Sequence, residues 1–285
     1  MCGRKRKSHI RLFKKEIITK IYMEVKTCNS GHYTKISVIT VCYNAVESIE
    51  NTIRSVISQT YSNVEFIVID GHSSDGTVDI IKKYEDKICK WVSERDKGVF
   101  DAMNKAIDMA TGEWLLFMNA GDTFAEKDVI CSFFNGVDYD EDVGVVFGDA
   151  FFLQPDNSLS YYKSSPFAER KCGIRDMGIC HQAIFTRTSL ARRFKFDFSY
   201  KYAADYNMMM NIFKSGYKFS YNTIPVCVYN LDGISSNNKL SQFKEIARIC
   251  GVSNTTLPYF QGFMKTVYII TKIKIVKVLR KLHLK

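Results

Sequence analysis

Apolar segments of two kinds alternate along residues 35–150, and this alternation constrains the fold more than any other feature of the chain. "KISVITVCYN" (35–44) and "VEFIVID" (64–70) are short and rich in β-branched residues, which is typical of buried strands. "VESIENTIRSVISQT" (46–60) and "DGTVDIIKKYED" (75–86) instead place apolar residues at helical spacing. Strands that alternate with helices at these distances predict an α/β domain with a mostly parallel central sheet and helices on both faces.

The alternation continues to residue 149 and then loosens. A chain of 285 residues with 46% hydrophobic residues is long enough to bury a substantial core around such a sheet. The remaining predicted elements are strands at 89–94, 113–119 and 143–149, helices at 99–110 and 125–135, a hairpin at 151–163, a strand at 179–186, a helix at 203–216 and short strands near 217–229.

Positive charge is concentrated at the two ends of the chain. Residues 1–26 hold nine Lys and Arg with two acids, and residues 262–285 hold seven with none. Residues 27–261 hold 24 basic and 28 acidic residues, a net charge of −4. A nucleic-acid enzyme would carry basic residues on its folded body, so this distribution argues against a nucleic-acid partner. Basic ends favour an anionic membrane surface instead.

The nine cysteines are scattered, with neither a CxxC pair nor zinc-ligand spacing. Buried, reduced thiols in a cytoplasmic protein are therefore the favoured interpretation. No apolar h-region follows the basic N-terminus, and no stretch has the apolar length that a membrane span needs. We expect a cytoplasmic protein that reaches the inner face of the cell membrane only peripherally.

Polar side chains follow the predicted strands at the edge where parallel sheets bind their ligands. "VIDGHSSDGT" (68–77) ends a strand, turns at Gly71 and begins a helix. Its polar residues have two explanations. In the first, Ser and Asp occur here only because their side chains cap the start of a helix. In the second, Asp70 accepts hydrogen bonds from the base or ribose of a ligand.

Two further segments carry acids at this edge. "SERDKGVFDAMNKAI" (93–107) gathers acids around Gly98, where Asp96 either caps the following helix or belongs to a ligand site. Acids this close repel one another unless a cation or a donor-rich ligand lies among them. "FMNAGDTF" (117–124) places Asp122 just after a buried strand, either as a turn residue or as a ligand for a group outside the sheet.

Taken in order, these segments resemble a known family. "ISVITVCYNAVESIENTIRSVISQTYSNVEFIVIDGHSSDGT", followed by "SERDKGVFDAMNKAIDMATGEWLLFMNAGD", is similar to the N-terminal half of family 2 glycosyltransferases, which have the GT-A (Rossmann-like) fold. "HQAIFTRTSL", "YKYAADYNMMMNIFKSGYKF" and "NLDGISS" resemble a subgroup that builds bacterial exopolysaccharides of the colanic acid type. The resemblance covers about residues 35–236. It implies inverting transfer of a sugar from a nucleotide-diphosphate donor, expected to be a UDP-sugar, to an acceptor hydroxyl.

The resemblance implies a metal and a ligand for it. "NAGD" takes the place of the family's DxD motif, in which a strand-end acid holds Mg²⁺ or Mn²⁺ against the diphosphate of the donor. Asn119 replaces the first acid, and Asp122 remains as the metal ligand. The residues expected around the donor are Tyr43, Asn44, Asp70, Asp75, Asp96, Asp101, Asn104 and Asn119.

The resemblance also implies a catalytic base. Asp205 in "YAADYNMMM" takes its place, although an Asp in the first turn of a helix can equally complement the helix dipole. His181 and Gln182 are expected to face the same cleft. His181 either touches a phosphate or the acceptor, or is a structural histidine.

We expect the acceptor to be a glycan, lipid-linked and part of a growing bacterial surface polysaccharide such as a capsule. Residues 274–282 would form a helix with apolar residues on one side and Lys and Arg on the other, as in helices that lie on anionic lipid. A helix packed on the body with solvated charges is the alternative. The expected parts are a basic extension (1–34), a nucleotide-sugar-binding half (35–150), an acceptor-binding half with the base (151–236) and a helical, basic, membrane-proximal segment (237–285).

Three other function classes fit the sequence less well. A catalytically weak nucleotide-sugar-binding module would fit Asn119, but it would have no need of Asp205. A membrane or nucleic-acid adaptor would use the basic ends and leave the strand-end acids without a role. A sugar nucleotidyltransferase should have a Gly-rich loop with Arg and Lys after its first strand, and "CYNAVES" is not such a loop.

Overall fold

The computed structural model describes residues 33–272, apart from 155, 166–176, 232–237, 253, 255–258 and 261. Residues 259–260 and 262–272 are helical and are called the last described helix below. The strands are β1 (Ile36–Cys42), β2 (Val64–Asp70), β3 (Lys90–Ser93), β4 (Trp114–Phe117), β5 (Thr123–Phe124), β6 (Val143–Leu153), β7 (Leu159–Tyr162), β8 (Ile184–Arg187) and β9 (Lys218–Asn230). The helices are α2 (Ile49–Ile57), α3 (Thr77–Lys83), α4 (Val99–Met109), α5 (Val129–Phe134), α6 (Thr188–Phe194), α7 (Ala204–Lys214) and α8 (Lys239–Ile249), with 3₁₀ turns η1 (Glu85–Lys87) and η2 (His181–Ala183).

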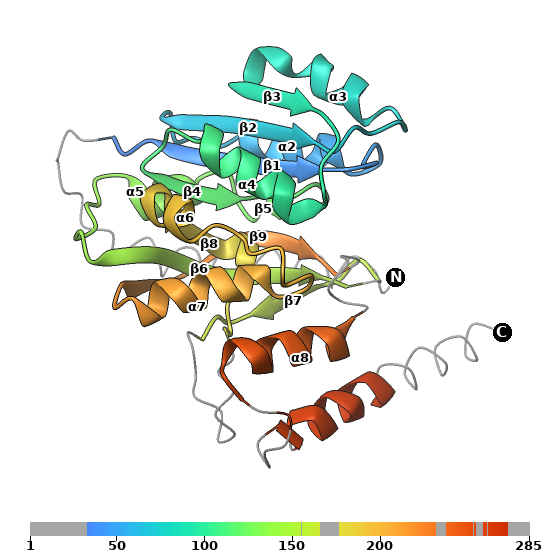
Figure 1. Ribbon diagram of the computed structural model, residues 1–285. Helices are drawn as coiled ribbons and strands as arrows, with labels where there is room; N and C mark the ends of the chain where they lie inside the picture. The colour runs from blue at the N-terminus through green and yellow to red at the C-terminus, as the bar shows by residue number, and fades with distance from the viewer. Residues whose placement is uncertain are drawn as a thin grey trace, which may run out of the picture.

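The strands form one sheet in the order β3-β2-β1-β4-β8-β6-β9-β5, with β7 paired to β6 (Figure 1). β1, β2, β3, β4, β6 and β9 run in one direction, whereas β5, β7 and β8 run in the other. The mostly parallel α/β sheet predicted from the sequence is therefore confirmed. The sheet also continues across residue 150, because β6 spans that position.

Two hydrophobic layers cover the sheet, one on each face. Successive side chains of a strand point to opposite faces, so Val38 of β1 joins the layer under α2 and α5, whereas Ile39 joins the layer under α4, α6 and α7. Figure 1 shows α4, α6 and α7 on the side of the sheet nearest the viewer. Each fully buried Ile or Phe in these layers contributes about 1.5–3 kcal/mol.

Two predicted elements differ in the structure. The segment 179–186 is not a continuous strand, because η2 turns the chain at His181–Ala183 before β8 begins. The short strands expected near 217–229 are one strand of 13 residues, β9. Shifts of register against β6 interrupt its pairing, which explains why its sequence lacks regular alternation.

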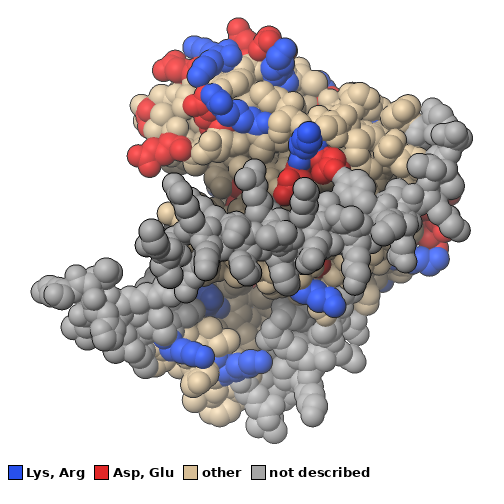
Figure 2. Space-filling view, turned by 180° about the vertical axis from the view of Figure 1, so that it is seen from behind, with Lys and Arg blue, Asp and Glu red and all other residues tan. Residues whose placement is uncertain are grey.

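Figure 2 shows Lys and Arg interleaved with Asp and Glu on the upper part of the face opposite that of Figure 1, rather than a continuous basic surface. None of the described helices has both the length and the apolar character needed to cross a bilayer. The predicted helix at 274–282 and most of the basic extension lie outside the described residues.

Candidate active site

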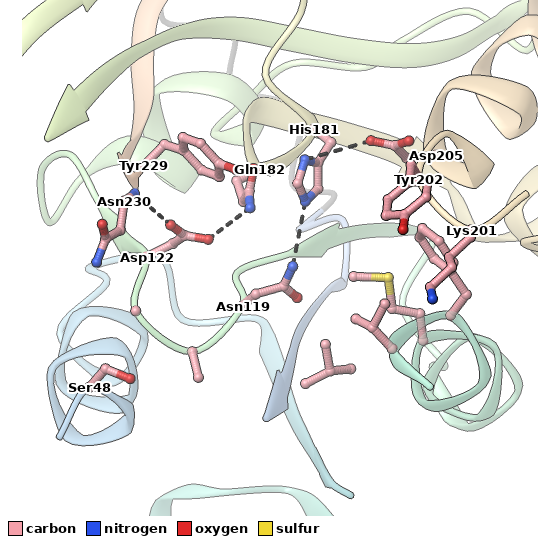
Figure 3. Close-up of a pocket in the computed structure, with 16 residues that line it drawn as sticks. Ser48, Asn119, Asp122, His181, Gln182, Lys201, Tyr202, Asp205, Tyr229 and Asn230 are labelled. Atoms are coloured by element: carbon pink, nitrogen blue, oxygen red, sulfur yellow. Dashed lines mark hydrogen bonds and ion pairs between the residues drawn. The ribbon is translucent and has the colours of Figure 1, made fainter. Parts of the chain in front are cut away.

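A cleft of about 360 Å³ opens at the carboxyl ends of β1 and β4 (Figure 3). The chain turns there between a buried strand and the next element, so polar side chains and backbone groups reach the surface. Five of the sequence-predicted residues line this cleft together with others that were not predicted. The polar lining residues are Ser48, Asn119, Asp122, His181, Gln182, Lys201, Tyr202, Asp205, Tyr229 and Asn230.

Asp122 lies at the base of the cleft and is only 4% exposed. The turn before it needs Gly121, whose φ of 101° lies in the left-handed region. Oδ2 of Asp122 accepts a hydrogen bond of 2.7 Å from Nε2 of Gln182, and Oδ1 accepts one of 2.9 Å from the backbone N–H of Asn230. Burial raises the pKa of Asp122 to about 7, although both hydrogen bonds lower it. This carboxyl group therefore changes its charge near neutral pH.

His181 lies between the two halves of the cleft. Its Nδ1 is 3.8 Å from Oδ2 of Asp205, and its Nε2 is 3.5 Å from Nδ2 of Asn119 (Figure 3). Burial lowers the pKa of His181, and the Asp205 carboxylate opposes this effect. A neutral imidazole at this position can accept a hydrogen bond from Asn119 while its N–H faces Asp205.

Asp205 is in the first turn of α7 and faces the cleft with its side chain 26% exposed. One of its oxygens also accepts a hydrogen bond from the backbone N–H of Tyr206. The carboxylate is thus held in place and still accessible to a molecule in the cleft. A group that removes a proton from a substrate needs this combination.

The loops after β1 and β2 bind each other. Oδ1 of Asn44 accepts a hydrogen bond from the N–H of Ser74, and Asp75 accepts one from the N–H of Val46. The pKa of Asp75 is lowered, first by the hydroxyl of Thr77. Asp70 is fully buried and accepts hydrogen bonds from the hydroxyls of Ser73 and Ser93. These hydrogen bonds hold the two loops in place, and the side chains that accept them are those of Asn44, Asp70 and Asp75.

Tyr43 and Asp96 remain beside these loops. Tyr43 is 67% exposed. A Cβ at Gly71 would lie 2.7 Å from Oδ2 of Asp96 and 3.3 Å from the Tyr43 ring, so the three residues form one small surface. An exposed aromatic ring next to a carboxylate suits stacking and hydrogen bonding with a planar ligand.

The other two predicted donor residues, Asp101 and Asn104, have partners within the protein. Asp101 accepts a hydrogen bond from the N–H of Lys97. Both polar atoms of the buried Asn104 amide bind the backbone of Phe196, which attaches α4 to the segment before α7. The structure therefore does not bring Asn104 to the cleft.

Sequence reasoning missed several residues that line the cleft. Lys201 and Tyr202 come from the loop before α7, and Tyr229 and Asn230 come from the end of β9. Lys201 and Tyr202 lie within the quoted segment "YKYAADYN", Asn230 begins "NLDGISS", and Tyr229 directly precedes it, so adjacency to these motifs was the available signal.

Asn119 and Asp122 fit a divalent cation that a bound diphosphate shares, rather than one held by the chain alone. Oδ1 of Asn119 is buried and has no hydrogen-bond partner. Each oxygen of Asp122 accepts one hydrogen bond and has a second lone pair. Such oxygens suit Mg²⁺ and Mn²⁺. Within the described ranges, no cluster of three or more His, Cys, Asp or Glu could hold a metal.

Comparison with known proteins places this geometry in a family. The family model described as glycosyl transferase family 2 matches residues 37–200. The chain is 29% identical over 206 residues to a PGL/p-HBAD biosynthesis glycosyltransferase of Mycobacterium tuberculosis, covering 70% of this chain and 78% of the relative. It is also 29% identical over 222 residues to the Escherichia coli UDP-Glc:alpha-D-GlcNAc-diphosphoundecaprenol beta-1,3-glucosyltransferase WfaP, covering 75% and 83%.

Solved structures share the fold. Staphylococcus aureus TarS 1–349 in complex with UDP matches with a TM-score of 0.56 at 19% identity, covering 78% of this chain and 73% of that one. The mannosyltransferase PcManGT from Pyrobaculum calidifontis, in complex with GDP-Man and Mn²⁺, matches with a TM-score of 0.60 at 18% identity, covering 85% and 71%. The chain therefore belongs to glycosyl transferase family 2, has the GT-A fold, and is a glycosyltransferase.

Proposed function

We propose that this glycosyltransferase moves a sugar from a UDP-sugar to a hydroxyl of a lipid-linked glycan in a growing bacterial surface polysaccharide, with inversion at the anomeric carbon. The observation that carries the proposal is that Asp205 and the Asn119–Asp122 turn line one cleft. Inverting transfer needs a base on one side of the reacting carbon and stabilisation of the leaving group on the other. The cleft offers candidates for both.

Asp205 is the proposed base. Its accessible carboxylate takes the proton of the acceptor hydroxyl while that oxygen forms a bond to the anomeric carbon. The bond from the anomeric carbon to the diphosphate breaks, and the nucleotide diphosphate leaves with the electron pair. His181, 3.8 Å from Asp205, holds the carboxylate toward the cleft and stays neutral because burial lowers its pKa.

Asn119 and Asp122 are the residues that would hold Mg²⁺ or Mn²⁺, with Gln182 positioning Asp122. When bound, the cation would offset the negative charge that develops on the departing diphosphate. Lys201 is a cationic residue in the cleft lining and is available for a phosphate oxygen. Tyr43 and Asp96 are the proposed contacts for the base of the nucleotide, since their surface suits a planar ring.

The substrate class is supported by the relatives. By its name, WfaP uses UDP-glucose and an acceptor on diphosphoundecaprenol. Structures of TarS contain UDP or UDP-GlcNAc. A lipid-linked acceptor lies in a membrane, so the enzyme would act peripherally at the inner face of the cell membrane.

The test is a donor screen followed by product analysis. The full chain is incubated with Mn²⁺ and UDP-glucose, UDP-GlcNAc or GDP-mannose, and released nucleotide diphosphate is measured with and without a sugar diphosphate on a long-chain alcohol. We expect acceptor-stimulated release from one UDP-sugar, and a β-linkage in the NMR spectrum of the product from an α-linked donor. Retained α-configuration would refute inversion. Donor binding without release would instead support the nucleotide-sugar-binding module that Asn119 permits.

A further inference from the structure

The last described helix has an inner face that packs on α8. The ring of Phe243 in α8 lies 5.4 Å from the ring of Tyr259 and 6.5 Å from that of Phe263. Tyr259 and Phe263 also stack on each other. Because these two residues are four apart, they lie on one side of the helix and fix which side faces outward.

The outer face carries an apolar ridge, formed by Phe260, Met264 and Tyr268. These side chains are 59%, 49% and 67% exposed, and their spacing of four residues aligns them along the helix. Lys265 and Lys272 lie next to the ridge on the same helix. A contiguous exposed apolar surface beside cationic side chains is typical of a helix that lies in a membrane interface.

Charge determines which partner suits the ridge. Residues 262–285 contain seven Lys and Arg and no Asp or Glu. The last described helix carries Lys265 and Lys272 and no acid, and α8 carries three Lys or Arg and one acid, Glu245. Two copies of such a face would repel each other, whereas an anionic surface would attract it.

The ridge is connected to the cleft through α8. Glu245 of α8 accepts hydrogen bonds of 2.9 and 2.8 Å from the backbone N–H groups of Lys201 and Tyr202, which line the cleft. Arg248 donates one of 2.8 Å to the carbonyl oxygen of Ser199 in the same loop. The last described helix therefore packs on an element that is hydrogen-bonded to the cleft wall next to Asp205.

We propose that the ridge of Phe260, Met264 and Tyr268 inserts into the interface of an anionic phospholipid bilayer, with Lys265 and Lys272 on the headgroups. This inference rests on the lipid-linked acceptor of the proposed function. It narrows the sequence prediction, in which the basic C-terminal segment with its helix at 274–282 lies on the membrane, to three described residues of that segment. The anchor holds the enzyme on the surface where its acceptor lies without a helix that spans the bilayer.

The test compares the full chain with the variant F260S/M264S/Y268S in flotation with vesicles. We use vesicles of mixed phosphatidylglycerol and phosphatidylcholine, and vesicles of phosphatidylcholine alone. The parent should bind the anionic vesicles, and binding should weaken between 0.1 M and 1 M salt because the screening length falls from about 10 to about 3 Å. The ridge variant should bind roughly tenfold more weakly or worse. A variant with Ile57→Ser and Leu159→Ser, which removes apolar side chains that are 38% and 40% exposed elsewhere on the surface, should bind as the parent does.

Three outcomes overturn the inference. The first is a ridge variant that floats as well as the parent, and the second is a control variant that loses binding equally. The third is a parent that does not float but forms a dimer that the ridge variant breaks, because a second copy would then cover the ridge. Donor hydrolysis without vesicles is measured in parallel and should be equal in the parent and the ridge variant, which also reports folding. If neither hydrolyses any donor, the proposed function fails whatever the vesicles show.

Discussion

Nε2 of Gln182 donates a hydrogen bond of 2.7 Å to Oδ2 of Asp122, a residue 60 positions earlier in the chain. The other oxygen of Asp122 accepts a hydrogen bond from the backbone N–H of Asn230. One buried carboxylate therefore joins the turn after β4, the turn η2 and the end of β9. Asp122 is therefore a structural connection within the cleft as well as the proposed metal ligand. Activity measurements test the ligand role, and unfolding measurements test the structural role.

Asp122→Asn should remove metal-dependent release of nucleotide diphosphate, by roughly a hundredfold or more, because an amide is a weaker ligand than a carboxylate. The protein should stay folded, since the amide oxygen of Asn can still accept one of the two hydrogen bonds. Release is measured over a titration of Mn²⁺, with circular dichroism as the check on folding. Asp86→Asn, an exposed acid, is the matched control. Undiminished release at the same Mn²⁺ concentration would refute the ligand assignment.

The raised pKa of Asp122 predicts a pH dependence. With a pKa of about 7, Asp122 is largely protonated below neutral pH, and a cation must displace that proton. Metal-dependent release should therefore rise as pH increases through 7. Gln182→Ala removes a hydrogen bond that lowers this pKa, so its rise should occur at higher pH than that of the parent. Rates are compared across the neutral range at subsaturating Mn²⁺. An identical profile in both proteins would show that Asp122 does not set the pH dependence.

The stability of the metal-free protein should also depend on the ionisation of Asp122. It should fall as pH increases, whereas metal-dependent release should rise. The folded-state pKa of Asp122 is raised above the ordinary Asp value, so ionisation costs the folded state free energy. The stabilising contribution of the protonated form is present below the unfolded pKa and is lost as pH rises through about 7. Asp122→Asn cannot ionise and should show a smaller loss of stability over this range in urea unfolding with a chelator. An equal loss in both proteins would assign the effect to other groups.

The parallel half of the sheet could be predicted because it is encoded locally. β1 and β2 are runs of β-branched residues buried on both faces, and α2 places Ile49, Ile53 and Val56 on one side. The antiparallel insertion of β8 between β4 and β6 could not be predicted, since it depends on pairing between segments distant in sequence. The division of the segment 179–186 into η2 and β8 has the same origin.

The site was predictable to a similar degree. Residues at strand ends and in motifs, such as Asp122 and Asp205, lie at the cleft. Asn104 has the same motif context, but its amide binds the backbone of Phe196, and a sequence does not reveal where an amide finds its partner. Lys201 was missed because only its adjacency to the Asp205 motif separates it from other exposed lysines in loops.

Asp205→Asn should abolish sugar transfer and leave donor binding within about twofold of the parent, because the base acts on the acceptor and not on the nucleotide. Calorimetry of UDP binding with Mn²⁺ measures donor binding, and formation of product on a glycan acceptor measures sugar transfer. The matched control is Asp197→Asn, an exposed Asp in the segment before α7. Transfer at the parental rate would remove Asp205 from the mechanism, and loss of UDP binding would place it at the donor instead.

Glu65 is an acid outside the cleft that is buried near the amino ends of the parallel strands β1 and β2. Its carboxylate accepts hydrogen bonds from the hydroxyl of Ser37 and from the backbone N–H and hydroxyl of Thr111, and Lys90 is 3.2 Å away. Burial alone would raise the pKa of Glu65, but these donors together lower it from the ordinary value of 4.5 to about 2.

Glu65→Gln should therefore destabilise the fold by about 1–3 kcal/mol at neutral pH, because the amide replaces an ionised acceptor that several donors share. The folded pKa of Glu65 is depressed, so its contribution is fully present above 4.5 and is lost as pH falls through about 2. The difference between the parent and the variant in urea unfolding should accordingly shrink as the pH is lowered over that window. Glu47→Gln makes the same charge change at an exposed position and should have little effect at any pH. A difference between parent and Glu65→Gln that stays constant with pH would mean that packing, not the ionised carboxylate, is what the fold loses.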